Sequence, residues 1–131
     1  MKLFTLLNHS LTQEQLAQIH TLNITEIISL NTESTLDSSS GGLWGQIPPE
    51  IADISPLLQP YKQALQAQSS KGDYLFVQGD FGATYAMVEY AKSLGLIAIY
   101  ATTLRKSKEI LNKDGSITKQ NVFKHCIFRK Y

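Results

Sequence analysis

Two short polar segments follow apolar runs of the chain and carry residue types suited to binding an anion or moving a proton. The first is Asn8, His9 and Ser10, and the second runs from Gly79 to Thr84. His9 carries an imidazole, which can transfer a proton near neutral pH. If the two apolar runs are neighbouring strands wound to opposite sides of a sheet, both segments flank the point where open α/β sheets bind ligands.

The second segment has the composition of an anion-binding loop at the start of a helix. Gly79 and Gly82, on either side of Phe81, let the backbone approach a ligand closely. The amides of Gly82, Ala83 and Thr84 would then lie at the positive end of the helix dipole. No Lys follows as in a P-loop, and the G-x-G-x-x-G spacing is absent. The loop therefore predicts a phosphate contact, without nucleoside triphosphate hydrolysis or NAD chemistry.

Three residues have two interpretations each. Asp80 either bonds a ribose hydroxyl or accepts a proton, or it is the N-cap of the helix. Thr84 either contacts a phosphate or is an ordinary first-turn residue. Trp44 either stacks on a base or fills the core.

Further polar residues follow a third apolar run. Thr102, Thr103 and Arg105 come after Leu96 to Ala101, at the same predicted edge of the sheet. Arg offers a planar fork for phosphate, whereas the neighbouring Lys106 offers a point charge. Arg105 is therefore the predicted phosphate ligand.

The hydropathy pattern predicts an open, mostly parallel α/β sheet flanked by helices, as a single domain over residues 1–131. Strands are predicted at Leu3 to Leu7, Glu26 to Leu30, Tyr74 to Gln78, Leu96 to Ala101 and Phe123 to Arg129, and helices at Gln13 to Thr21, Pro60 to Gln68, 83 to 94 and Arg105 to Leu111. Pro56 and Pro60 argue against a longer second helix. A turn at Asp114-Gly115 predicts a C-terminal hairpin, and the serine-rich stretch Asn31 to Gly42 a surface loop.

Composition excludes several classes of protein. The 131 residues are 43% apolar and 18% charged, as in a globular domain, and no apolar run approaches the ~20 residues that span a bilayer. We expect a cytoplasmic protein without a membrane partner. The single Cys126 cannot form an internal disulfide, and His9, His20 and His125 lack zinc-ligand spacing. No metal or other cofactor is predicted.

The net charge of +1 hides an asymmetry between the two halves. Residues 1–65 carry two Lys or Arg against six Asp or Glu, whereas residues 66–131 carry ten against five. Eight of the basic residues follow Thr103. This excess either binds something anionic or keeps a hairpin soluble.

Five segments together resemble the small CRISPR-associated Csx family numbered twenty, an ancillary family of type III systems. They are LLNHSLT (6–12), LWGQIPPE (43–50), GDYLFVQGDFGATYAMV (72–88), SLGLIAIYATTLR (93–105) and FKHCIFRKY (123–131). The resemblance implies a CARF-like Rossmann domain, a homodimer, and a ring nuclease that linearises cyclic oligoadenylate, most simply cyclic tetra-adenylate. A two-fold dimer would match the symmetry of that ring.

The expected cleavage is metal-independent, with a ribose 2′-hydroxyl attacking its neighbouring phosphate. The amides of Gly82, Ala83 and Thr84, together with Arg105, would stabilise the phosphorane, and His9 or Asp80 would accept the proton. The alternative is a binding module that sequesters the ring uncut. Binding of long nucleic acid is not expected, because Phe81 and Tyr85 fall in apolar patterns and form no exposed stacking row.

Overall fold

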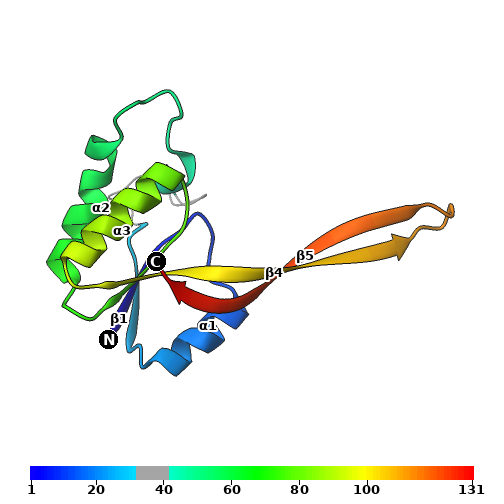
Figure 1. Ribbon diagram of the computed structural model, residues 1–131, viewed down its shortest axis with the longest axis horizontal. Helices are drawn as coiled ribbons and strands as arrows, with labels where there is room; N and C mark the ends of the chain where they lie inside the picture. The colour runs from blue at the N-terminus through cyan, green and yellow to red at the C-terminus, as the bar shows by residue number, and fades with distance from the viewer. Residues whose placement is uncertain (32–41) are drawn as a thin grey trace.

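In the computed structural model, which describes residues 1–31 and 42–131, five strands form one sheet in the order β2-β1-β3-β4-β5 (Figure 1). The strands are β1 (Lys2–Leu6), β2 (Glu26–Ser29), β3 (Tyr74–Val77), β4 (Ile97–Leu111) and β5 (Ile117–Lys130). The first four are parallel, and β5 is antiparallel to β4. The predicted α/β class, with a mostly parallel sheet and a C-terminal hairpin, is confirmed.

Helices cover both faces of the sheet. They are α1 (Gln13–Ile19), α2 (Ser55–Gln68) and α3 (Phe81–Ser93), with 3-10 turns η1 (His20–Leu22) and η4 (Gly42–Gln46). Ile19 of α1 packs with Phe76 on one face, whereas Tyr61 of α2 and Met87 of α3 pack with Phe4 on the other. Figure 1 shows α2 beside α3, with α1 on the opposite side of the sheet. Because β1 and β3 are neighbours and the chain leaves them toward opposite faces, the predicted switch point lies between them.

Local capping sets the ends of two helices. Thr12 accepts a hydrogen bond from the Gln15 amide, and the Gln15 side chain accepts one from the Thr12 amide, which completes the predicted capping box. The α-helix then changes into η1 after Ile19, and Asn23 closes the turn with a φ of 57°. Gly95, with a φ of 77°, follows the end of α3 as predicted.

The second helix is longer than the sequence predicts. It begins at Ser55 and continues through Pro60, so the prediction that proline starts the helix at residue 60 is wrong. Pro56 lies in the first turn, where no intrahelical N–H bond is lost. Pro60 does lose one, but Leu58, Tyr61 and Leu65 are buried along a continuous stripe. Their burial outweighs the missing hydrogen bond.

The basic stretch Arg105 to Leu111 is strand, so the prediction that it is helical is wrong. It belongs to β4 and pairs residue by residue with β5. The pairing begins at Ile99 opposite Lys130. Beyond a β-bulge, from Thr103 opposite His125 to Leu111 opposite Ile117, it forms a two-stranded ribbon that projects from the body (Figure 1). We call this ribbon, residues 103–125, the hairpin arm. Helical propensity in this stretch is overridden by cross-strand pairing.

Replacement of the interior proline of α2 should stabilise the protein. Pro60→Ala restores the N–H that binds the carbonyl of residue 56, and we expect the free energy of unfolding to rise by about 1–3 kcal/mol. Pro56→Ala is the matched control and should change it by less than about 0.5 kcal/mol, because that N–H has no intrahelical acceptor. Urea denaturation of the three proteins measures both effects. A destabilised Pro60→Ala protein would show that the proline ring itself is needed.

Candidate functional site

Asp80 is the N-cap of α3, which was one of its two predicted interpretations. Its Oδ2 accepts a hydrogen bond of 3.0 Å from the Ala83 amide, and its carbonyl accepts one of 2.8 Å from the Thr84 amide. Two of the three amides predicted to bind a phosphate are therefore already used. Phe81 and Gly82 supply the N–H groups that the helix itself does not use. An anion at this position would also lie beside the Asp80 carboxylate.

Trp44 fills the core, which was one of its two predicted interpretations. Its side chain is 1% exposed, its Nε1 donates a 2.9 Å hydrogen bond to the Gln78 carbonyl, and its ring meets Tyr61 edge-on. A Cβ added to Gly79 would lie 2.6 Å from that Nε1. Glycine at position 79 is therefore explained by the close approach of the indole, and not by approach of a phosphate.

The loop that follows β1 is exposed. Leu6 pairs with Val77, so the loop leaves the same sheet edge as the start of α3. Asn8, His9 and Ser10 are all exposed, and Nδ1 of His9 lies 2.8 Å from the Ser10 carbonyl oxygen. None of the three lines either cavity at this edge. The prediction that they bind a ligand or transfer a proton is supported only by their position at this edge of the sheet.

The residues after Ala101 do not join the predicted site. Thr102 lies opposite a β-bulge, where its hydroxyl bonds both the amide and the carbonyl of Ile127 at 3.1 Å. Thr103 and Arg105 lie on the hairpin arm, and Arg105 stacks on Phe123 with 5.9 Å between guanidinium and ring centre. Arg105 lies about 13 Å along the strand from Ala101. Within one chain, the prediction that Arg105 lies at the sheet edge next to the anion loop is wrong, because β4 continues past Ala101 into the arm.

A cavity lined by aromatic side chains lies between the start of α3 and β4. It has a volume of about 400 Å³. Its lining consists of Gln78, Gly79, Phe81, Thr84, Tyr85, Val88, Tyr100 and Tyr131. We call it the aromatic cavity. It brings together three predicted residues (Gly79, Phe81 and Thr84) with tyrosines that were not predicted as site residues.

The polar groups of the aromatic cavity are few. Thr84 Oγ1 is buried and has no hydrogen-bond partner among the described residues. The Tyr131 hydroxyl donates a 2.5 Å hydrogen bond to the Val77 carbonyl. Burial, followed by the proximity of Tyr100, raises the pKa of Tyr131 to about 12, so this hydroxyl stays protonated. The cavity thus offers aromatic rings and, in Thr84, a buried hydroxyl without a partner among the described residues.

Two of these rings are far more exposed than the sequence indicates. Phe81 is 94% exposed and Tyr85 is 69% exposed, so the prediction that both are part of an apolar pattern is wrong. They are four residues apart on α3, on a different face from the buried stripe that contains Ala83 and Met87. Their spacing, out of phase with the buried stripe, was the signal in the sequence that both rings are exposed. The contributions of Tyr100 and Tyr131 had no local signal, because they come from other parts of the sheet.

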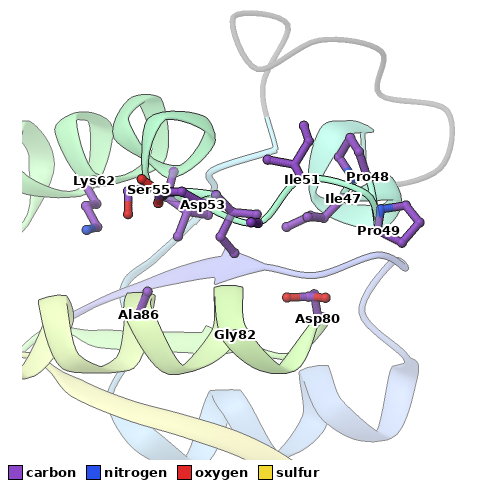
Figure 2. A pocket seen from close by; sticks show the side chains of 13 residues that line it. Ile47, Pro48, Pro49, Ile51, Asp53, Ser55, Lys62, Asp80, Gly82 and Ala86 are labelled. Carbon is purple, nitrogen blue, oxygen red and sulfur yellow. Dashed lines mark hydrogen bonds between the residues drawn. The ribbon is translucent and has the colours of Figure 1, made fainter.

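A second cavity lies on the other side of α3, between α3, α2 and the segment that precedes α2 (Figure 2). We call it the α2–α3 cavity, and its volume is about 410 Å³. Figure 2 shows Ile47, Pro48 and Ile51 on one wall and Asp80 on the other. Its lining also includes Asp53, whose pKa is lowered by hydrogen bonds from Ser55. The cavity combines apolar walls with two carboxylates.

Other classes of site were searched in residues 1–31 and 42–131. In these ranges, no three His, Cys, Asp or Glu side chains gather as metal ligands would. Within the same ranges, the helices are too short or too polar to cross a membrane. The predicted surface loop over residues 31–42 lies almost wholly outside the described residues.

Comparison with known proteins gives a family. The family described as "Uncharacterized protein MJ1673 family" matches residues 1–129. The chain is also 44% identical over 131 residues to "Uncharacterized protein MJ1673" of Methanocaldococcus jannaschii, which covers 99% of this chain and 96% of that protein. No solved structure matches it.

The two glycines of the predicted anion loop should respond differently to alanine. Gly79→Ala forces a Cβ into the Trp44 indole and should lower the free energy of unfolding by about 1–3 kcal/mol. Gly82→Ala meets its nearest atom, Asp80 Oδ2, at an ordinary 3.6 Å, and alanine favours the helix. We expect it to be neutral or up to about 1 kcal/mol stabilising. Thermal and urea denaturation of both variants tests this, and equal losses would contradict the packing explanation of Gly79.

Proposed function

We propose, for a chain that belongs to the MJ1673 family, that it is a cytoplasmic ring nuclease of type III CRISPR signalling with a CARF-like Rossmann domain. Its substrate would be cyclic oligoadenylate, most simply cyclic tetra-adenylate, bound by a two-fold homodimer. The observation that carries the proposal is the aromatic cavity at the carboxyl edge of β3 and β4. The sequence resemblance supplies the nature of the ligand.

The chemistry of the aromatic cavity suits an adenine base. Phe81 and Tyr85 present exposed rings, and stacking of a base on an aromatic ring is worth about 1–3 kcal/mol. The Thr84 hydroxyl, which has no partner among the described residues, is free to bond the edge of the base. The free Phe81 and Gly82 amides lie at the same helix start, within reach of a neighbouring phosphate. The aromatic cavity therefore offers a surface for a base, and the start of α3 beside it offers donors for a phosphate.

Cleavage would use the nucleophile that RNA itself carries. A ribose 2′-oxygen attacks the adjacent phosphorus, the bond from phosphorus to the 5′-oxygen breaks, and a 2′,3′-cyclic phosphate and a 5′-hydroxyl are formed. The 2′-hydroxyl proton passes to His9 or Asp80, and the departing 5′-oxygen takes up a proton. Asp80 uses only Oδ2 as the helix cap, which leaves Oδ1 for that proton. The protein's main contribution would be to hold the attacking oxygen in line.

Sequestration of the ring without cleavage is the second candidate. It is favoured by one observation: within a single chain His9, Asp80 and Arg105 are not assembled, and Asp80 is engaged as a cap. Binding and cleavage would use the same aromatic cavity. The two candidates differ only in whether linear products are formed.

Incubation of the purified protein with cyclic tetra-adenylate in the presence of EDTA tests the activity. Chromatography should show linear products with 2′,3′-cyclic phosphate ends. Loss of the true general base should lower the single-turnover rate by about 10²–10⁴-fold with binding retained. His9→Ala and Asp80→Asn are the variants to compare, because Asn keeps the helix cap while it removes the carboxylate.

Each result decides between the candidates. Tight binding with no product would establish sequestration. Full activity in both variants would show that neither residue is the base. If the protein neither binds nor cleaves cyclic tetra-adenylate, that ring is not its ligand.

Removal of the exposed rings tests the aromatic cavity directly. Phe81→Ala and Tyr85→Ala should each weaken binding of the ring by about 5–150-fold, which corresponds to one lost stacking interaction. Both side chains are exposed, so the fold should persist. Tyr90→Leu, on the same helix but outside the cavity, is the control and should bind normally. Isothermal titration of the four proteins measures this, and unchanged affinity in both alanine variants would place the ligand elsewhere.

A further inference from the structure

The hairpin arm has no core of its own. Several apolar side chains along it are exposed: Leu104 (49%), Ile110 (40%), Leu111 (76%), Ile117 (61%), Val122 (45%) and Phe123 (66%). Its root is fixed to the body by a 2.6 Å hydrogen bond between His125 and Gln18. Beyond that root it extends for about 27 Å as two strands only. A two-stranded ribbon is marginally stable in water, so its apolar surface needs a partner.

One face of the arm combines three of these apolar side chains with cations, whereas Leu111, Ile117 and Phe123 lie on the other face. Residues directly opposite each other in the ladder share a face. The pairs on this face are Leu104 with Lys124, Lys106 with Val122, Lys108 with Gln120 and Ile110 with Thr118. We call it the arm face. Its apolar side chains are interleaved with three lysines, so a complementary surface would be apolar and acidic.

The charge of the chain is divided between the arm and the body. The arm, residues 103–125, carries six Lys or Arg against two Asp or Glu, a net +4. The rest of the chain carries six against nine, a net −3. The arm projects away from its own body (Figure 1), so it cannot neutralise that body itself. Two copies that exchange arms would bring opposite charges together, whereas arm-to-arm pairing would bring like charges together.

The α2–α3 cavity has the chemistry that the arm face requires. Ile47, Pro48 and Ile51 give it an apolar wall, and Ile51 is 40% exposed. Asp53 and Asp80 supply two exposed carboxylates, which outnumber the single cation that lines it, Lys62. Figure 2 shows Asp53 and Asp80 on opposite walls of the cavity. An apolar side chain of the arm would enter between them, with a lysine on either side.

We propose that the arm face of one copy docks on the α2–α3 cavity of a second copy, and that the exchange is reciprocal in a two-fold homodimer. Lysines of the arm lie against Asp53 and Asp80, and apolar side chains of the arm cover the wall formed by Ile47 and Ile51. The interface requires no ligand. It also places cations beside Asp80 at the start of α3, next to the aromatic cavity.

A pair of charge-reversed chains tests the exchange. The arm variant is Lys106→Glu with Lys108→Glu, and the cavity variant is Asp53→Lys with Asp80→Asn, which keeps the cap of α3. For each variant alone, the dissociation constant of the dimer should be at least about tenfold higher than for the wild type, because the arm and the cavity repel or no longer attract each other. Mixed together, the two variants should form a dimer, since the reversed arm matches the reversed cavity and the wild-type arm matches the wild-type cavity.

Sedimentation velocity and light scattering measure the masses at micromolar protein, and circular dichroism confirms that each variant folds. Glu26→Lys, which reverses one carboxylate on β2 outside the cavity as Asp53→Lys does inside it, is the control and should leave the dimer intact. A cavity variant that dimerises as the wild type does would overturn the proposal in favour of arm-to-arm pairing. A mixture that stays monomeric would also overturn it. The proposal would also be overturned if the wild-type chain were monomeric and used the lysines of the arm to bind single-stranded RNA.

Discussion

Gln78 holds together the carboxyl edge on which the rest of this structure depends. Its amide donates to the Leu6 carbonyl at 3.3 Å, its carbonyl accepts from Trp44 Nε1 at 2.9 Å, and its Oε1 accepts from the Ala101 amide at 2.9 Å. One residue thus connects β1, β4 and the Trp44 segment just beyond the last residue of β3. The side-chain bond to Ala101 replaces the ladder bond that β3 is too short to make. Through this bond β3 and β4 stay connected at the carboxyl edge, although the two strands diverge there.

That divergence creates both the aromatic cavity and the hairpin arm. Where β3 ends at Val77, the chain turns into α3, and β4 continues without a neighbour on that side. The space between α3 and β4 becomes the aromatic cavity, and the continuation of β4 with β5 becomes the hairpin arm. Asp80 lies between the two cavities and lines the one beside α2. Docking of a partner's arm and binding of a ring would therefore be coupled through the first turn of α3.

Features set by a few neighbouring residues could be predicted from the sequence. The capping box of Thr12 and Gln15 and the left-handed Gly95 each depend on contacts within one helical turn. The alternation of apolar runs with a helical stripe gave the strand–helix order, and the Asp114-Gly115 turn gave the hairpin. The switch point was predicted only on the condition that β1 and β3 are neighbours with helices on opposite faces, and the tertiary structure meets that condition. Of the residues proposed for the site, Gly79, Phe81 and Thr84 do lie together.

The amino-acid sequence by itself thus determined the α/β class, the cap at the start of α1 and the glycine that ends α3. Only the tertiary structure decided that α2 runs through Pro60, that Arg105 lies on an extended strand, and that Trp44 is buried against Gly79. Tertiary structure also brought Tyr100 and Tyr131 to the aromatic cavity. The physical reason is the same in each case: the deciding partner lies far away in the chain, and burial or strand pairing with it outweighs the local preference.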